Sequence, residues 1–430
     1  MGRLLGVGAL ALGLLVAAGP TARPLGLAGP DRQAKELVGV VFRDGEGNSL
    51  IRLDEGLNAH GPRLRVGYLD AWTLSPQSDI AALSTHPTDT GSVQDVLRFV
   101  AVRSLKLVPR TIPLGGSALT MLWANPHRIV ALVQDCCTNT VSVAVVDPGA
   151  RRILSSAPLG GDAAVWTRVG DRLLILVTPT NAIGPARLVV VDAVGGVRTV
   201  KLERVVAGNS WPDDHSSGML GTQQIPAVAA DPATNRAYVI QPDGPAAEVS
   251  LESLDVSYRE LAPSSLAARL SAWLQPEAQA KGMNGTAWHG LSLGNGFVAV
   301  TGNVQRAVIN GNTEQMSSSP AGLAIVDVRN WTMRTVDRGA DDVAVADGLL
   351  LATGRSWSST EQRTTGMGLA AYGPDTKLRF HLFEGGSAWV QQTWGGRAYI
   401  LVDSKTTVVE LATGRVVEQR AGTTPWLLLP

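Results

Sequence analysis

Residues 118–161 hold four strand-length apolar segments, and turn-forming residues separate each segment from the next. The segments are residues 118–123, 128–134, 140–147 and 151–159. Pro, Gly, Asn and Asp fill the breaks, and most segments are rich in β-branched residues, so the pattern predicts strands joined by tight turns. Such a four-stranded antiparallel meander leaves apolar faces uncovered, so it needs neighbours of its own kind.

Units of this kind recur along the chain, mostly at the period of a propeller blade, about 40–50 residues. Seven complete units begin at Ala71, Ala118, Ala164, Ile225, Trp288, Asp341 and Ala388. The larger steps between units contain insertions. We therefore predict an all-β chain that folds as a β-propeller of four-stranded antiparallel blades.

The two ends of the chain hold the remaining strands. Three predicted strands precede the first unit, at residues 39–43, 49–54 and 63–69, and one apolar segment follows the last unit, at residues 423–430. We favour eight blades, with the ring closed by the C-terminal strand joining the N-terminal strands. Such closure leaves no long exposed sheet edge between blades. The alternative is seven blades, with the N-terminal strands as an accessory.

Composition supports a large folded domain and excludes some partners. Hydrophobic residues make up 45% of the 430 residues, and 47 glycines and 24 prolines suit many tight turns. Lys plus Arg and Asp plus Glu both number 37, so the net charge is zero and no basic stripe is present. We therefore expect no nucleic acid and no anionic membrane as partner. Separately, we expect a monomer.

The first residues predict a secretory address. Arg3 precedes a nearly pure apolar segment at residues 4–18, as in a signal peptide. We expect a signal peptide within residues 1–28, cleaved between residues 18 and 28, then a linker at residues 29–35 and a single propeller domain at residues 36–430. The apolar segment is short for a membrane span, which needs about 20 residues. An uncleaved N-terminal anchor is the alternative, and both place the protein outside the cytoplasm, secreted or in the cell envelope.

Several repeats resemble a known superfamily. Residues 138–153, residues 235–261 and VVELATGRVV at residues 408–417 resemble YVTN-type repeats of the WD40-like and quinoprotein-like propellers. SPQSDIAALS, at residues 75–84, is similar to the first hairpin of a WD40-like blade. The resemblance covers most of residues 36–430 at the level of the repeat. It implies the propeller fold, and such propellers host unrelated functions.

All the long insertions are predicted on one face of the propeller. In a four-stranded meander the second turn and the link to the next unit lie at the same end. The long segments fall at those positions: second turns at residues 86–94, 178–185, 303–320 and 355–366, and links at residues 203–224 and 262–287. The last link contains a predicted helical insertion near residues 264–281. We favour a lid packed on the rim for this insertion; a gate above the channel is the alternative. Binding residues are expected on this loop-rich face.

The candidate binding residues come from these insertions or lie near the expected channel. They are Trp211, Asp213, Asp214, His215, His289, Arg306, Asn310, Asn312, Glu314, Arg355, Trp357, Glu361 and Arg363. The eight from Arg306 to Arg363 come from two neighbouring units and could form one polar patch; two solvated loops are the alternative. Asp213, Asp214 and His215 suit metal binding or proton transfer, but no second His stands at ligand spacing, so we predict no metal site.

Cys136 and Cys137 are the only cysteines and lie in a second-turn segment. In an oxidising compartment they could form a strained vicinal disulfide; two reduced thiols are the alternative. Some quinone-dependent propeller dehydrogenases carry such a ring against their cofactor. Their recurring tryptophan docking motif is missing here, so we predict no cofactor.

No nucleophile elbow, phosphate-binding loop or zinc-protease motif occurs in the sequence. We favour a secreted, non-catalytic scaffold that binds an unknown protein, glycan or small-molecule ligand through the loop-rich face. The alternative is a propeller enzyme, either a hydrolase of the lactonase type or a quinone-dependent oxidoreductase, with its site at the channel mouth. Converging carboxylates or histidines with shifted pKa values would favour the enzyme. An aromatic and polar surface would favour the non-catalytic scaffold.

Overall fold

The computed structural model describes residues 37–43, 47–54, 56–86, 95–135, 138, 140–210, 222–242, 244–263, 283–310, 313–359 and 363–421. Over these residues every regular element is a β-strand, which confirms the all-β prediction there. No helix in this part of the chain is long and apolar enough to cross a membrane. The predicted signal peptide, linker and C-terminal strand and the helical insertion near residues 264–281 lie outside the described residues.

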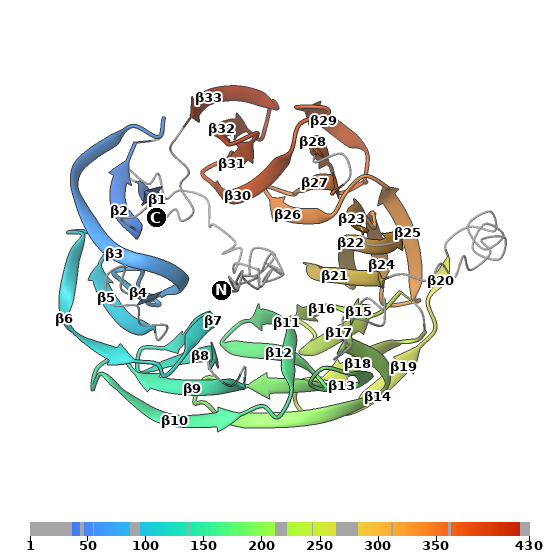
Figure 1. Ribbon diagram of the computed structural model, residues 1–430, viewed down its shortest axis with the longest axis horizontal. Helices are drawn as coiled ribbons and strands as arrows, with labels where there is room; N and C mark the ends of the chain where they lie inside the picture. The colour runs from blue at the N-terminus through green and yellow to red at the C-terminus, as the bar shows by residue number, and fades with distance from the viewer. Residues whose placement is uncertain are drawn as a thin grey trace, which may run out of the picture.

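The strands form successive antiparallel meanders arranged around a common centre, as in a β-propeller (Figure 1). Three of these meanders are separate four-stranded sheets. They are β7 (Ser117–Asn125), β8 (Arg128–Gln134), β9 (Val141–Asp147) and β10 (Arg152–Pro158); β16 (Ala227–Asp231), β17 (Arg236–Ile240), β18 (Ala246–Ser250) and β19 (Val256–Arg259); and β30 (Ala388–Trp394), β31 (Arg397–Val402), β32 (Lys405–Glu410) and β33 (Arg415–Ala421). The first of them is the unit expected at residues 118–161.

The same antiparallel order recurs three times inside one 15-stranded sheet. The strands are β11 (Asp162–Val169), β12 (Arg172–Thr178), β13 (Ile183–Val191) and β14 (Val197–Ser210); β21 (Met283–Gly294), β22 (Phe297–Asn310), β24 (Leu323–Asp327) and β25 (Thr332–Asp337); and β26 (Asp342–Ala346), β27 (Leu349–Ser358), β28 (Arg363–Tyr372) and β29 (Leu378–Leu382). The two-residue β20 (Ala262–Pro263) pairs in parallel with β25.

At the N-terminal end, one long strand serves two sets of partners. The first half of β3 (Ala59–Leu74) pairs with β2 (Gly47–Leu53), which pairs with β1 (Leu37–Arg43). Its second half pairs with β4 (Ile80–His86), and the sheet continues through β5 (Val96–Ala101) and β6 (Lys106–Pro113).

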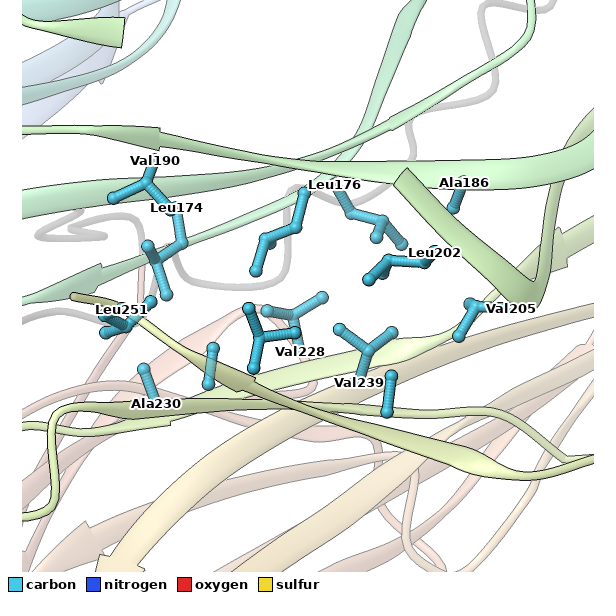
Figure 2. Packing of buried hydrophobic residues seen from close by; sticks show 14 of the residues in the cluster. Leu174, Leu176, Ala186, Val190, Leu202, Val205, Val228, Ala230, Val239 and Leu251 are labelled. Atoms are coloured by element: carbon cyan, nitrogen blue, oxygen red, sulfur yellow. The ribbon is translucent and has the colours of Figure 1, made fainter. Parts of the chain in front are cut away.

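Apolar packing between neighbouring meanders forms the core. Middle strands such as β8 and β12 are buried on both faces, whereas the outer strand β10 is largely exposed. Figure 2 shows Leu174, Leu176 and Leu202 of one meander facing Val228 and Val239 of the next. Each fully buried side chain of this size contributes about 1.5–3 kcal/mol, so each meander is stabilised mainly by its neighbours.

Residues from the two ends of the chain are in contact. Ile51, Leu53 and Leu57, from β2 and the turn after it, share a buried cluster with Tyr399 of β31 and Val408 of β32. Nearby, the guanidinium of Arg420 donates a hydrogen bond to the side-chain oxygen of Asn58. The N-terminal sheet therefore packs against the last meander.

Several segments predicted as long loops are strands instead. β22 continues to Asn310 and turns back as β23 (Thr313–Pro320), and β27 and β28 extend to Ser358 and Arg363. β14 likewise extends to Ser210, and β15 (Thr222–Ile225) follows. These segments were predicted as loops because they are long and fall at second turns and links. Pairing with a neighbouring strand satisfies their backbone polar groups, so they form strands whatever their side chains are.

Candidate functional site

The strand extensions of different meanders also pair with one another at the loop-rich end of the meanders. β14 pairs with β15, β15 pairs in parallel with β21 at Gly285–Ala287, and β21 pairs with the extended part of β22. β22 pairs with β23, which meets β27 at Ser317 and Ser318. We call these extensions the rim sheet; they are residues 206–210, 222–225, 283–287, 303–310, 313–320, 355–358 and 363–366. The insertions of three meanders thus form one paired surface.

Several sequence-predicted residues lie on the rim sheet. Arg306 stands opposite Ser317, and Trp357 stands opposite Ser318, so the two insertions that carry them meet. Arg306 and Arg355 are exposed, and Trp357 is 41% exposed. Asn310, Glu314 and Arg363 also occupy rim-sheet strands.

Of the remaining predicted binding residues, His289 is the one that the structure describes, and it lies outside the rim sheet. His289 lies on β21, opposite Thr301, and burial lowers the pKa of its imidazole, which favours the neutral form. The remaining candidates lie outside the described residues: Trp211, Asp213, Asp214, His215, Asn312, Glu361, Cys136 and Cys137.

Three ionisable side chains converge at the loop-rich end of the meander that β3 opens. Asp70 lies on β3, His86 is the last residue of β4, and Asp95 directly precedes β5. Nδ1 of His86 is 2.9 Å from Oδ2 of Asp70 and 3.6 Å from Oδ1 of Asp95. One potential ligand atom from each residue lies within 4.8 Å of the others, so the group can hold a metal ion.

Asp95 is fully buried and fixed by its neighbours. Its Oδ2 accepts hydrogen bonds from Oγ of Ser84, at 2.5 Å, and from the amide of Ala118 in the adjacent meander, at 3.0 Å. Oγ of Ser117 donates to Oδ1 at 3.4 Å. Burial and the nearby Asp95 carboxylate raise the pKa of Asp70 to about 6, against the opposing effect of His86.

Sequence reasoning missed this cluster. Its residues come from three segments, and none of the three was among the candidate residues. A usable signal was the pair His86 and Asp95, at the two ends of the second-turn segment predicted at residues 86–94. Because both ends of a turn lie close together, such a pair can share one site.

A second group of shifted carboxylates lies where β26 begins. The amide of Arg355 donates to Oδ2 of Asp341 at 3.0 Å. Burial raises the pKa of Asp341 to about 6. Burial, together with the charge of Asp341, raises the pKa of Asp342 to about 7, although Trp389 donates a hydrogen bond to it. Near neutral pH this pair can take up or release a proton, which is a property of general acids and bases.

Solved structures share this architecture. The chain is similar to the dihydro-heme d1 dehydrogenase NirN in complex with DHE, with a TM-score of 0.53 at 10% identity, covering 95% of this chain and 78% of that one. It is also similar to AztD of Citrobacter koseri, with a TM-score of 0.50 at 9% identity, covering 91% and 96% of the two chains. The apo form of that protein has a TM-score of 0.51. The likeness at this identity shows a β-propeller fold.

No protein-family model matches the chain, and no curated protein matches its sequence. The predicted membership of the WD40-like superfamily therefore stays a prediction, while the propeller itself is supported by the strand arrangement and by these structures.

Proposed function

We propose that this chain is a secreted β-propeller that binds a protein, glycan or small-molecule ligand through the rim sheet, without catalysis. The observation that carries the proposal is the pairing of the long insertions with one another. Pairing satisfies the backbone of each insertion, and it also joins the insertions of three meanders into one continuous surface. Binding residues are commonly found on such additions to a rigid scaffold.

The side chains of the rim sheet suit recognition. Trp357 and the two arginines, Arg306 and Arg355, are exposed there. Trp and Arg are the residue types that most often dominate binding energy at interfaces. Because the strands beneath them are paired on both sides, their backbone has little conformational freedom left to lose on binding. The zero net charge argues against a nucleic acid as the partner.

A photo-crosslinking residue at position 357 tests the proposal. The matched control carries the same residue at Val194, which is 71% exposed in the turn between β13 and β14, at the opposite end of the meander. Both proteins are exposed to the extracytoplasmic fraction of the producing cells and to an immobilised glycan panel. We expect a saturable crosslink from position 357 that position 194 does not give. Equal labelling from both positions, or none from position 357, would contradict the proposal.

A catalytic function is the second candidate, and the shifted carboxylates Asp341 and Asp342 favour it. In this proposal Asp342 acts as the general acid or base of a hydrolase. NirN, which has a similar fold, is a dehydrogenase, but fold alone does not choose between these functions. The test is turnover of a panel of lactones and esters by the wild-type protein and by Asp342→Asn. Turnover that this variant abolishes would replace the binding proposal.

We further propose that the propeller has eight blades with YVTN-type repeats, and that residues 423–430 close the ring beside β1, β2 and β3. The contact of Ile51 and Leu53 with Tyr399 supports closure, because it joins the two ends of the chain. The secretory address rests on the apolar segment at residues 4–18. N-terminal sequencing of the mature protein tests it, since a cytoplasmic chain that begins at Met1 would exclude the signal peptide.

A further inference from the structure

We propose that Asp70, His86 and Asp95 form a binding site for one first-row divalent metal ion such as Zn²⁺. The site is separate from the rim sheet, so the inference stands whether or not the rim sheet binds a ligand. It also differs from the sequence-based expectation, which placed no metal site in this chain.

The spacing of the three donors matches metal coordination. Tetrahedral Zn²⁺ with bonds of about 2.0–2.1 Å holds its ligand atoms about 3.3–3.4 Å apart. The distances from Nδ1 of His86 to the two carboxylates, 2.9 Å and 3.6 Å, lie on either side of this value. An ion between the donors therefore requires only small side-chain movements. Nδ1 gives up its proton and Nε2 carries one, so that a neutral imidazole binds the ion; a net proton goes to solvent only from the imidazolium form.

The surroundings of Asp95 orient it for this role. Ser84 and Ala118 occupy Oδ2, so Oδ1 is the oxygen that faces His86. Outer hydrogen bonds of this kind are typical around metal ligands, because they fix the direction of the ligand atom. A dication would also offset the charge of a carboxylate that has no solvent exposure.

A β-bulge positions Asp70. The pairing of β3 with β4 shifts between Leu69 and Ala71, so Asp70 is the extra residue. Bulges re-aim side chains and are frequent beside functional sites. The first strands β7, β11 and β30 have the same kind of bulge, but Leu119, Ala164 and Gln391 occupy it. The bulge is thus common to these four strands, whereas a carboxylate occupies it in β3 alone.

The ring of His86 is held by stacking on Tyr68, with 5.0 Å between ring centroids and 25° between planes. The side chains of His86 and Asp70 are each 32% exposed, so an ion can reach the site from solvent. Three protein ligands leave a coordination position for water or a ligand oxygen. One imidazole with two carboxylates suits first-row ions better than Ca²⁺ or Mg²⁺, which prefer oxygen ligands alone.

Calorimetric titration of the chelator-treated full chain with Zn²⁺ alone tests the proposal. We expect one equivalent of Zn²⁺ to be lost, or its affinity to fall at least tenfold, in Asp70→Asn and in His86→Gln. The matched control is His381→Gln, since His381 is also a partly exposed imidazole beside a carboxylate, 3.2 Å from Glu384. Its titration should match that of the wild type. Circular dichroism before metal addition verifies that each variant is folded.

Two further measurements do not need the variants. Co²⁺ bound to the wild-type protein should give the strong visible bands of a tetrahedral site, and a tenfold excess of Ca²⁺ should not displace Zn²⁺. The proposal is overturned if no stoichiometric Zn²⁺ binds, if both cluster variants keep the wild-type affinity, or if Ca²⁺ competes as well as Zn²⁺ does. In those cases the cluster is a hydrogen-bond network that joins β4 to β7.

Discussion

Asp342 lies on the strand of its meander nearest the common centre, where it keeps partial contact with solvent (Figure 1). Its pKa is raised to about 7 from an ordinary value of 3.8, chiefly by burial. Between about pH 4 and pH 7, Asp342 is therefore protonated in the folded chain and ionised in the unfolded chain. The stabilisation from this group is complete below pH 4 and is lost as the pH rises to 7.

A pH series of urea denaturation checks this. Each pKa unit corresponds to about 1.4 kcal/mol, and partial solvation reduces the effect, so we expect Asp342 to account for a fall of about 1–2 kcal/mol in unfolding free energy between pH 5 and pH 8. Asp342→Asn should remove that part of the fall. Asp347→Asn, in the turn at the other end of β26, should keep it. An unchanged pH dependence in Asp342→Asn would show that its carboxylate is ionised in the folded protein.

Glycines let neighbouring backbone segments approach closely at the loop-rich end of the meanders. A side chain at Gly302, where β22 passes into the rim sheet, would overlap the carbonyl oxygen of Ala287. The same close approach occurs at Gly116 against Gln134, at Gly161 against Thr178 and at Gly354 against Gly339. Glycine is therefore required at these close backbone approaches as well as in the turns.

Replacing Gly302 by alanine tests this requirement. We expect Gly302→Ala to lower the unfolding free energy by about 2–3 kcal/mol, because backbone must move to admit the methyl group. Gly149→Ala is the control: Gly149 lies in a turn and its nearest neighbour would be 3.4 Å from the new atom. Denaturant unfolding measures both. A fall in unfolding free energy of less than about 0.5 kcal/mol for Gly302→Ala would mean that the backbone around Gly302 and Ala287 moves apart easily.

The elements differ in how far the sequence predicts them. The β-branched segments of β8 and β9 and the turn formers between them predict strands directly. The rim sheet was not predicted, because Ser317 to Pro320 and similar segments are polar and pair only through backbone. In the Asp70 cluster, His86 and Asp95 flank one turn, but Asp70 joins them through a β-bulge, which leaves no local pattern in the sequence. Within the described residues, the meanders were predictable and the site was not.

On the scale of the molecule, closure of the propeller can be tested at the contact between the chain ends. We expect deletion of residues 423–430 to lower the unfolding free energy by about 2–4 kcal/mol, as we expect for Leu53→Ala, which leaves a cavity beside Tyr399. Val194→Ala, on an exposed turn, should change it by less than about 0.5 kcal/mol. Denaturant unfolding compares the three. Unchanged stability after the deletion would rule out the shared eighth blade.

β15 and β21 pair in parallel although residues 226–282, including the whole β16–β19 meander, lie between them in the sequence. Most contacts within a meander are local, whereas this pairing requires closure of a long loop and so raises the contact order. We infer that the meanders form early in folding and that the rim sheet assembles last. Late, non-local pairing of this kind also opens first in the native state. A partner that bound the rim sheet would therefore stabilise the part of the protein that local sequence stabilises least.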